Sequence, residues 1–167
     1  CLHPFIEEKI NEWLLNRKQP AVLLLGPPGI GKTTIAHRVF QIAGLKTVEF
    51  NASHTRSGTS FRKIILPLLR EGGIVQMIES GKRGGIGVLL DEIDGLSNGE
   101  KGGLSELHAY LKTKEVTNGR PLILISNTLD TRTLQQIAKI CLTFKVEAPE
   151  PQRLREWLGT DLPETYS

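Results

Sequence analysis

The stretch GPPGIGKTT, residues 26–34, constrains the fold of this chain more than any other feature. It lies between an apolar run of strand length, residues 21–25, and a segment of helical period that begins near residue 33. Its glycines allow backbone N–H groups to turn toward an anion, and the N-terminal end of the following helix adds a partial positive charge. A strand, a glycine-rich loop and a helix in this order predict a site that cradles phosphate groups.

Each residue type in this loop predicts a contact with a nucleotide triphosphate. We expect the Lys32 ammonium to reach the β and γ phosphates and the Thr33 hydroxyl to be a ligand of Mg²⁺. ATP and Mg²⁺ are therefore the expected cofactors. The predicted ATP-binding residues are Gly26, Pro27, Pro28, Gly29, Ile30, Gly31, Lys32, Thr33 and Thr34.

A second motif, VLLDEID at residues 88–94, supplies the acidic groups that such a site needs. Asp91 ends an apolar run and is predicted to hold Mg²⁺, through water. Glu92 is predicted to be the catalytic base, which orients and polarises the attacking water. The alternative is a strand that ends in a solvated acidic turn.

Asn127 follows a further apolar run, PLILIS at residues 121–126. A side-chain amide at the end of this strand could contact the γ phosphate or the attacking water and so sense the state of the nucleotide. An isolated Asn in this place is otherwise a common turn former. Lys32, Glu92 and Asn127 make up the predicted catalytic set.

Strand-length and helix-length segments alternate along the chain, which predicts one α/β domain with a mainly parallel five-stranded sheet between helices. The predicted strands are residues 21–25, 46–50, 86–91, 121–126 and 141–146. The predicted helices are residues 5–16, 33–43, 59–70, 101–113 and 131–139.

The composition excludes several other classes of protein. The 167 residues carry a net charge of +3, which permits contact with a polyanion without requiring it. Cys1 and Cys141 have no metal-ligand spacing and fit a reducing, intracellular compartment. The longest apolar runs are too short to span a bilayer, so no membrane partner is expected. Because Cys1 begins the chain and Met77 is its only Met, we expect a piece of a longer protein.

With a phosphate loop, an acidic strand and a sensor Asn in this order, the chain resembles the AAA+ ATPases. The stretch VEFNASHTRSG, residues 48–58, is similar to an element of clamp loaders of the replication factor C type, although His54 stands where that family usually has Asp. The resemblance covers residues 19–149. It implies an AAA+ phosphate-loop NTPase core over residues 1–149, followed at residues 150–167 by the start of a truncated lid or tail.

One departure makes the chain similar to the large subunit of such loaders. Small subunits carry a Ser-Arg-Cys motif before the last strand, whose arginine acts on the neighbouring subunit's ATP. Here the corresponding residues are Lys139, Ile140 and Cys141, without the arginine, as in the large subunit. The resemblance implies small clamp-loader subunits, a ring-shaped sliding clamp and primer–template DNA as partners, and a nuclear location if the source is eukaryotic.

The resemblance also implies two contact surfaces. The helices after the NAS element and after the acidic strand face DNA phosphates in clamp loaders, and such contacts carry no base sequence. The candidate DNA-binding residues are Arg56, Arg62, Lys63 and Lys101, with the backbone of Gly102 and Gly103. The candidate clamp contacts, at helical spacing, are Ile74, Met77 and Ile78. Solvated basic side chains and ordinary core residues are the alternatives for the two sets.

We therefore expect a subunit that couples ATP binding and hydrolysis to opening a clamp and placing it on primer–template DNA. A non-hydrolysing ATP-binding scaffold of the same assembly is a second hypothesis. A third is another AAA+ ATPase of DNA replication, such as an initiator or a branch-migration motor.

Overall fold

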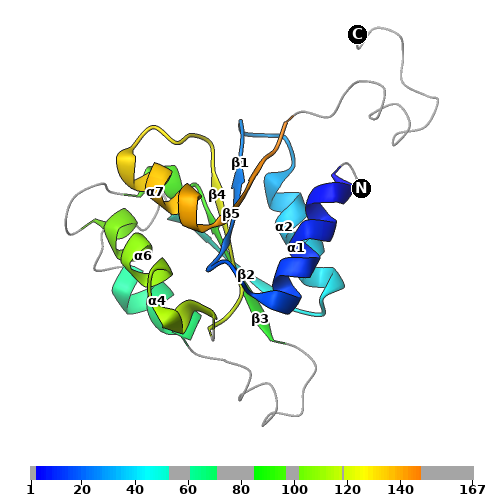
Figure 1. The fold of residues 1–167 in the computed structure, drawn as a ribbon, viewed down its shortest axis with the longest axis horizontal. Helices are drawn as coiled ribbons and strands as arrows, with labels where there is room; N and C mark the ends of the chain where they lie inside the picture. Colours follow the sequence, from blue (N-terminus) through cyan, green and yellow to red (C-terminus); the bar gives the residue numbers. More distant parts are fainter. Residues whose placement is uncertain (1–2, 53–60, 71–84, 97–101, 118, 148–167) are drawn as a thin grey trace, which may run out of the picture.

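A five-stranded parallel β-sheet organises the protein, here described from a computed structural model (Figure 1). The structure describes residues 3–52, 61–70, 85–96, 102–117 and 119–147. The strand order is β2-β3-β4-β1-β5, and every pair of neighbouring strands is parallel. The strands are β1 (Val22–Leu25), β2 (Lys46–Asn51), β3 (Ile86–Asp91), β4 (Leu122–Ser126) and β5 (Leu142–Lys145). The predicted fold class is confirmed.

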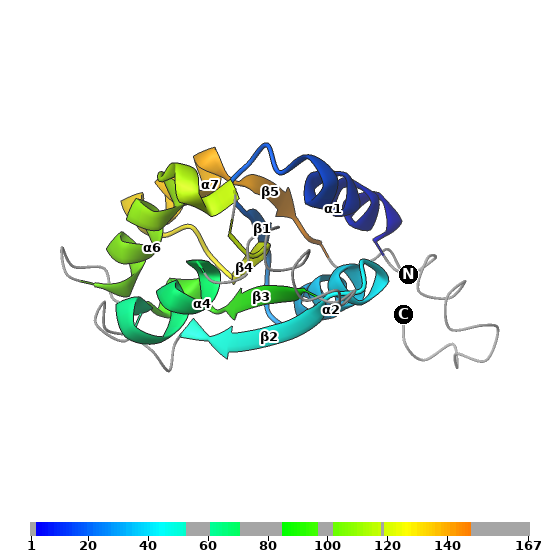
Figure 2. The same cartoon turned by 90° about the horizontal axis from the view of Figure 1, so that it is seen from below.

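Helices cover both faces of the sheet, as Figures 1 and 2 show. One face carries α1 (Pro4–Asn16) and α2 (Lys32–Ile42). The other carries the π-helix η2 (Phe61–Ile65), α4 (Leu66–Arg70), α6 (Gly103–Leu111) and α7 (Arg132–Ile140). Two short 3-10 helices, η3 (Ile93–Gly95) and η4 (Lys114–Thr117), belong to the connections between these elements.

The alternation of side chains along the strands divides the core into two clusters. Val22 and Leu24 of β1 pack with Ile35 and Phe40 of α2, whereas Leu23 packs into the cluster on the opposite face. All of these residues are buried. Because both faces of the central strands are covered, these strands are apolar at successive positions rather than at every second one.

The bounds of the elements agree with the sequence predictions to within one or two residues, where the structure describes both ends. The sequence predicts one α-helix over residues 59–70, but the described part of this segment is the π-helix η2 followed by the short α-helix α4. Pro67 explains the change. A proline inside an α-helix has no N–H to donate and its ring crowds the carbonyl of residue i−4, so a wider turn before it relieves both problems.

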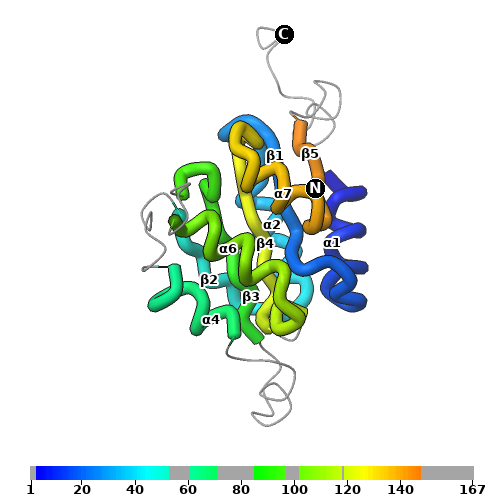
Figure 3. The backbone as a smooth tube through the Cα atoms, turned by 60° about the vertical axis from the view of Figure 1, so that its left-hand side comes forward, coloured from blue at the N-terminus to red at the C-terminus, as the bar shows by residue number. Residues whose placement is uncertain are grey.

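The end of α1 is fixed to the edge of the sheet where the parallel strands begin. Arg17 caps the helix in the left-handed region at φ 50°, and its N–H donates to the carbonyl of Trp13 at 2.7 Å. Its guanidinium lies 5.0 Å from the Trp13 ring and donates to the carbonyl of Val116 at 3.0 Å. Figures 2 and 3 place α1 beside β5. This packing leaves the opposite edge, where the strands end, for the loops that follow β1, β3 and β4.

No helix among the described residues is long and apolar enough to cross a membrane. The predicted lid or tail at residues 150–167 lies outside the described part of the chain.

A glycine in β3 makes room for the largest side chain of α2. A β-carbon added at Gly87 would lie 2.6 Å from the ring of Phe40, which is fully buried. We predict that Gly87→Ala destabilises the chain by about 1–3 kcal/mol in urea unfolding, the usual cost of overpacking a core. Combined with Phe40→Leu, the same substitution should cost less than the sum of the two single changes by at least about 0.5 kcal/mol. Strict additivity would show that the ring moves aside freely.

Candidate nucleotide-binding site

The carboxyl ends of β1, β3 and β4 bring the three sequence motifs to one edge of the sheet. Gly26 follows β1, Asp91 ends β3 and Asn127 follows β4. β1 lies beside β4, but the chain runs from β1 to the distant edge strand β2, and from β4 to β5 on the other side of β1. The connections that follow β1 and β4 therefore leave in opposite directions. Ligands of open α/β sheets bind in the crevice at such a point.

Glycine is required at several positions of the loop between β1 and α2. Gly29 and Gly31 have φ angles of 79° and 90°, which side chains rarely adopt. Gly31 is the N-cap of α2 and supplies no side chain to cap the helix, so the first N–H groups of α2 face the loop without a side-chain acceptor from it. At Gly26 the requirement is space, since an added β-carbon would lie 2.3 Å from the carbonyl oxygen of Val146.

Lys32 joins the loop to the end of β4. Its side chain is 5% exposed, and its ammonium donates to the carbonyl of Gly26, to the carbonyl of Pro27 at 2.9 Å and to Asn127 Oδ1 at 2.8 Å. These contacts occupy the three donors of the ammonium, so contact with a phosphate requires at least one of them to be redirected. Burial lowers the pKa of Lys32, and the carboxylates of Asp91 and Asp94 partly oppose this shift.

The predicted sensor Asn127 thus lies in direct contact with the predicted phosphate-binding lysine. The preceding residue, Ser126, is fully buried and donates from its hydroxyl to the carbonyl of Thr128 at 2.6 Å, which holds the turn after β4. The side-chain amide of Asn127 is therefore presented from a fixed turn at the carboxyl edge of the sheet.

The two predicted magnesium ligands are also brought together. Thr33 Oγ1 donates to Asp91 Oδ2 at 3.5 Å, and the N–H of Glu92 donates to Asp91 Oδ1 at 2.8 Å. Burial is the largest influence on Asp91 and raises its pKa, the nearby charges of Glu92 and Glu49 raise it further, and the two hydrogen bonds oppose the shift.

The chemistry of these donors fits Mg²⁺, which prefers oxygen ligands, binds through one or two carboxylates and keeps several waters. Within the described ranges, no group of three or more His, Cys, Asp or Glu is placed to hold a metal by itself. A hydroxyl and a single carboxylate beside a phosphate loop suit an ion that takes its remaining ligands from phosphate and water.

The predicted base, Glu92, has an unusual backbone conformation. Its φ of 55° and ψ of 48° lie in the left-handed region, and it forms the N-cap of η3. This region costs a residue with a β-carbon about 1 kcal/mol or more and is found in excess at functional sites. The strained residue directly follows Asp91, the last residue of β3.

The predicted DNA-binding residues are only partly described. Arg62 and Lys63 lie in η2, where the guanidinium of Arg62 is 3.5 Å from Glu106 of α6. Gly102 is the N-cap of α6 and Gly103 is its first residue. Arg56, Lys101 and His54 fall outside the described residues, as do the predicted clamp contacts Ile74, Met77 and Ile78.

The residues that replace the arginine motif lie at the end of α7. Lys139 is exposed, and Ile140 is partly buried against the core cluster beneath α6 and α7. Cys141 is buried, which raises the pKa of its thiol to about 12 and keeps it in the protonated form. The Ile140 side chain is a hydrocarbon and supplies no charge to a neighbouring molecule.

The sequence pattern did not identify two polar side chains that lie beside the predicted magnesium ligands. His37 Nε2 of α2 lies 3.0 Å from Glu49 Oε2 of β2. The sequence did contain one indication of this site, the charged Glu49 between the apolar residues Val48 and Phe50. Because side chains alternate along a strand, Glu49 must lie on the opposite face of the strand from these two residues. Which helix covers that face could not be read from the pattern.

A parallel sheet with a glycine-rich loop before α2 and an acidic end to β3 defines an α/β nucleotide-binding domain of the phosphate-loop class. Residues 22–148 match the family model described as ATPase family associated with various cellular activities (AAA). The chain belongs to this family, and the resemblance to AAA+ ATPases is confirmed.

Individual relatives confirm the similarity to large subunits of replication factor C. Replication factor C subunit 1 of Oryza sativa subsp. japonica is 34% identical over 144 residues, which cover 80% of this chain and 14% of that protein. Replication factor C subunit 1 of Saccharomyces cerevisiae is 32% identical over 84% of this chain and 16% of its own length. The Replication factor C large subunit of Methanococcus aeolicus is 33% identical over 84% of this chain and 28% of its own length. The chain thus corresponds to a minor part of each relative.

The raised pKa of Asp91 predicts that this residue opposes folding when no ligand is bound. A carboxyl group with a higher pKa in the folded than in the unfolded state lowers stability above that pKa, and the penalty disappears below the ordinary Asp value of about 3.9. Asp91→Asn should therefore raise the Tm at neutral pH by roughly 1–3 °C without Mg²⁺ or nucleotide. Calorimetry at decreasing pH should show this difference shrinking. A lower Tm for the variant at pH 7 would contradict the expectation.

Proposed function

We propose that this chain is the ATP-binding and ATP-hydrolysing domain of a DNA clamp-loader subunit that resembles the replication factor C large subunit. The main support is that the strands bring Lys32 into contact with Asn127, and Thr33 into contact with Asp91, around one phosphate-binding loop. The similarity to replication factor C large subunits supports the choice of assembly.

Binding of the nucleotide is assigned to the loop and the start of α2. Backbone N–H groups of residues 29–34 would surround the phosphates, and the buried Lys32 ammonium would place its charge against the β and γ phosphates. Thr33 and Asp91 would hold Mg²⁺. When bound, the ion supplies positive charge to the phosphate oxygens.

Hydrolysis is assigned to Glu92 and Asn127. Glu92 accepts a proton from the attacking water and orients it toward the γ phosphate. In this proposal the Lys32 ammonium contacts the γ phosphate and also donates a hydrogen bond to Asn127 Oδ1. A change in the nucleotide is thereby communicated to the end of β4.

The residues at the end of α7 indicate which position the subunit occupies in the assembly. With Ile140 where small subunits carry an arginine, the chain cannot complete a neighbour's ATP site through this motif. An arginine supplied in trans is worth orders of magnitude in the rate of phosphoryl transfer. We therefore propose that its partners are small subunits, and that this subunit occupies a terminal position.

The proposed loader opens a ring-shaped sliding clamp and places it on primer–template DNA. Arg62 and Lys63 on η2, with Arg56 and Lys101, are the proposed contacts to DNA phosphates. Ile74, Met77 and Ile78 are the proposed contacts to the clamp. If the source is eukaryotic, this activity belongs in the nucleus.

Experiments can distinguish two alternative functions from this one. A non-hydrolysing scaffold would bind ATP and never turn it over in the reconstituted complex. Another AAA+ ATPase of DNA replication would act without a sliding clamp. The combination of Glu92 with the Asp91 and Thr33 pair favours hydrolysis, since a scaffold needs no base beside the magnesium ligands.

Two substitutions should separate binding from hydrolysis. Lys32→Ala removes the ammonium that contacts phosphates in the ground state, so we predict loss of measurable ATP binding in calorimetry. Glu92→Gln keeps the shape of the side chain and removes the base, so binding should persist while single-turnover hydrolysis falls by roughly 100-fold or more. Equal loss of binding in both variants would contradict these roles.

The pair between Arg62 and Glu106 predicts a gain of DNA affinity. Glu106 competes with phosphates for the guanidinium, which is 3.5 Å away. In the assembled loader, Glu106→Gln should tighten binding to primer–template DNA by about two- to threefold at low salt, and the gain should shrink as salt is raised. Glu12→Gln, on α1 at the other face of the sheet, is the control for loss of one negative charge. No gain at low salt would exclude Arg62 from the DNA surface.

A further inference from the structure

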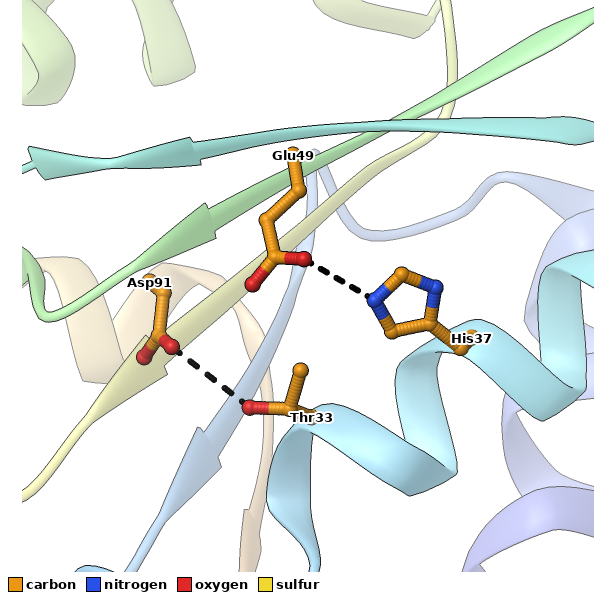
Figure 4. A network of polar contacts seen from close by, with 4 residues as sticks. All are labelled: Thr33, His37, Glu49 and Asp91. Atoms are coloured by element: carbon orange, nitrogen blue, oxygen red, sulfur yellow. Dashed lines mark hydrogen bonds and ion pairs between the residues drawn. The ribbon is translucent and has the colours of Figure 1, made fainter.

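Glu49 of β2 lies on the same face of the sheet as Asp91 (Figure 4). Glu49 pairs in register with Leu89, which is two residues before Asp91 on β3. Because side chains alternate along a strand, Leu89 and Asp91 point to one face, and Glu49 points there with them. Leu89 packs in the cluster that contains Ile35 and Phe40 of α2, which identifies this face as the one covered by α2.

α2 contacts both carboxylates with side chains one turn apart. Thr33 and His37 are four residues apart and therefore lie on the same side of the helix. Thr33 Oγ1 donates to Asp91 Oδ2 at 3.5 Å, and His37 Nε2 lies 3.0 Å from Glu49 Oε2. Figure 4 shows the second carboxylate oxygen of Glu49 turned away from His37, on the side of Asp91.

The Glu49 charge reaches Asp91 without a hydrogen bond between them. It repels the Asp91 carboxylate through space, as does the charge of the neighbouring Glu92. The side chains of Glu49 and His37 remain 39% and 45% exposed, so water has access to the space beside them. Two carboxylates on the same face of the sheet, with water access beside one of them, repel each other, and a nearby cation would offset this repulsion.

We propose that Glu49 is a positioning residue for Mg²⁺ at the nucleotide site, accepting hydrogen bonds from the water shell of the ion, with its carboxylate held by His37. The inference rests on the proposed nucleotide-binding function. Mg²⁺ gives up its waters reluctantly and is commonly held through them, which gives a carboxylate outside the direct ligands a partner. The groups that orient metal ligands and bound waters set metal affinity as well as geometry.

A purely structural role for the pair predicts different behaviour. An exposed His–Glu contact between α2 and β2 contributes little to stability. Its loss would loosen α2 and weaken nucleotide binding equally with and without Mg²⁺. A positioning role changes only the part of the affinity that depends on Mg²⁺.

The test measures binding of an ATP analogue with an imido bridge between the β and γ phosphates, by calorimetry, over a series of Mg²⁺ concentrations and in EDTA. For Glu49→Gln we expect the Mg²⁺ concentration that gives half of the affinity gain to rise by about tenfold. The affinity in EDTA should stay the same or increase, because a negative charge near the phosphates is removed. Glu115→Gln is the matched control, since Glu115 is also in an exposed ion pair, 3.1 Å from Arg70, and belongs to η4.

Three results would overturn the inference in distinguishable ways. An unchanged Mg²⁺ requirement in Glu49→Gln rejects Glu49 alone and leaves the nucleotide site intact. Equal weakening in Mg²⁺ and in EDTA assigns the pair to structure, as does a larger effect of His37→Ala than of Glu49→Gln. No binding of the analogue to the unaltered chain under any condition removes the proposed function, and the inference with it.

Discussion

The contacts of the Lys32 ammonium hold the site together. A buried ammonium needs acceptors for its donors, and here they come from the carbonyls of the loop and from the amide of Asn127 beyond β4. This one group therefore fixes the loop after β1 to the neighbouring strand. The geometry depends on a parallel sheet, because only strands that run in the same direction present their carboxyl ends, and the loops after them, at a common edge.

Much of this arrangement could be predicted from the sequence. The apolar runs predicted the strands, and the types of residue at their ends predicted that the phosphate loop, the acidic pair and Asn127 would meet at one edge of the sheet. The contacts between segments that are far apart in the sequence could not be predicted. The His37 and Glu49 contact depends on which helix covers β2, and the π-turn of η2 depends on how the chain relieves Pro67. Neither leaves a periodic pattern.

The site concentrates charge that the fold does not need. Asp91 is partly buried near the carboxylates of Glu92 and Glu49, and Glu92 adopts a backbone conformation that favours glycine. Each feature costs stability in the absence of a cation, while the apolar clusters on both faces of the sheet offset the cost. Such a distribution, with strain confined to one edge and regular packing elsewhere, is expected where selection acts on ligand affinity as well as on folding.

Gly26 links the nucleotide loop mechanically to the end of β5. Its α-carbon faces the carbonyl of Val146 too closely for a side chain, and the N–H of Val146 donates to the carbonyl of Leu25 at 2.7 Å. The first residue of the loop and the residue that follows β5 are thus in close backbone contact. Because there is no free space between Gly26 and the carbonyl of Val146, a shift of the first loop residue in that direction would have to displace Val146 as well, so these two backbone segments behave as one mechanical unit.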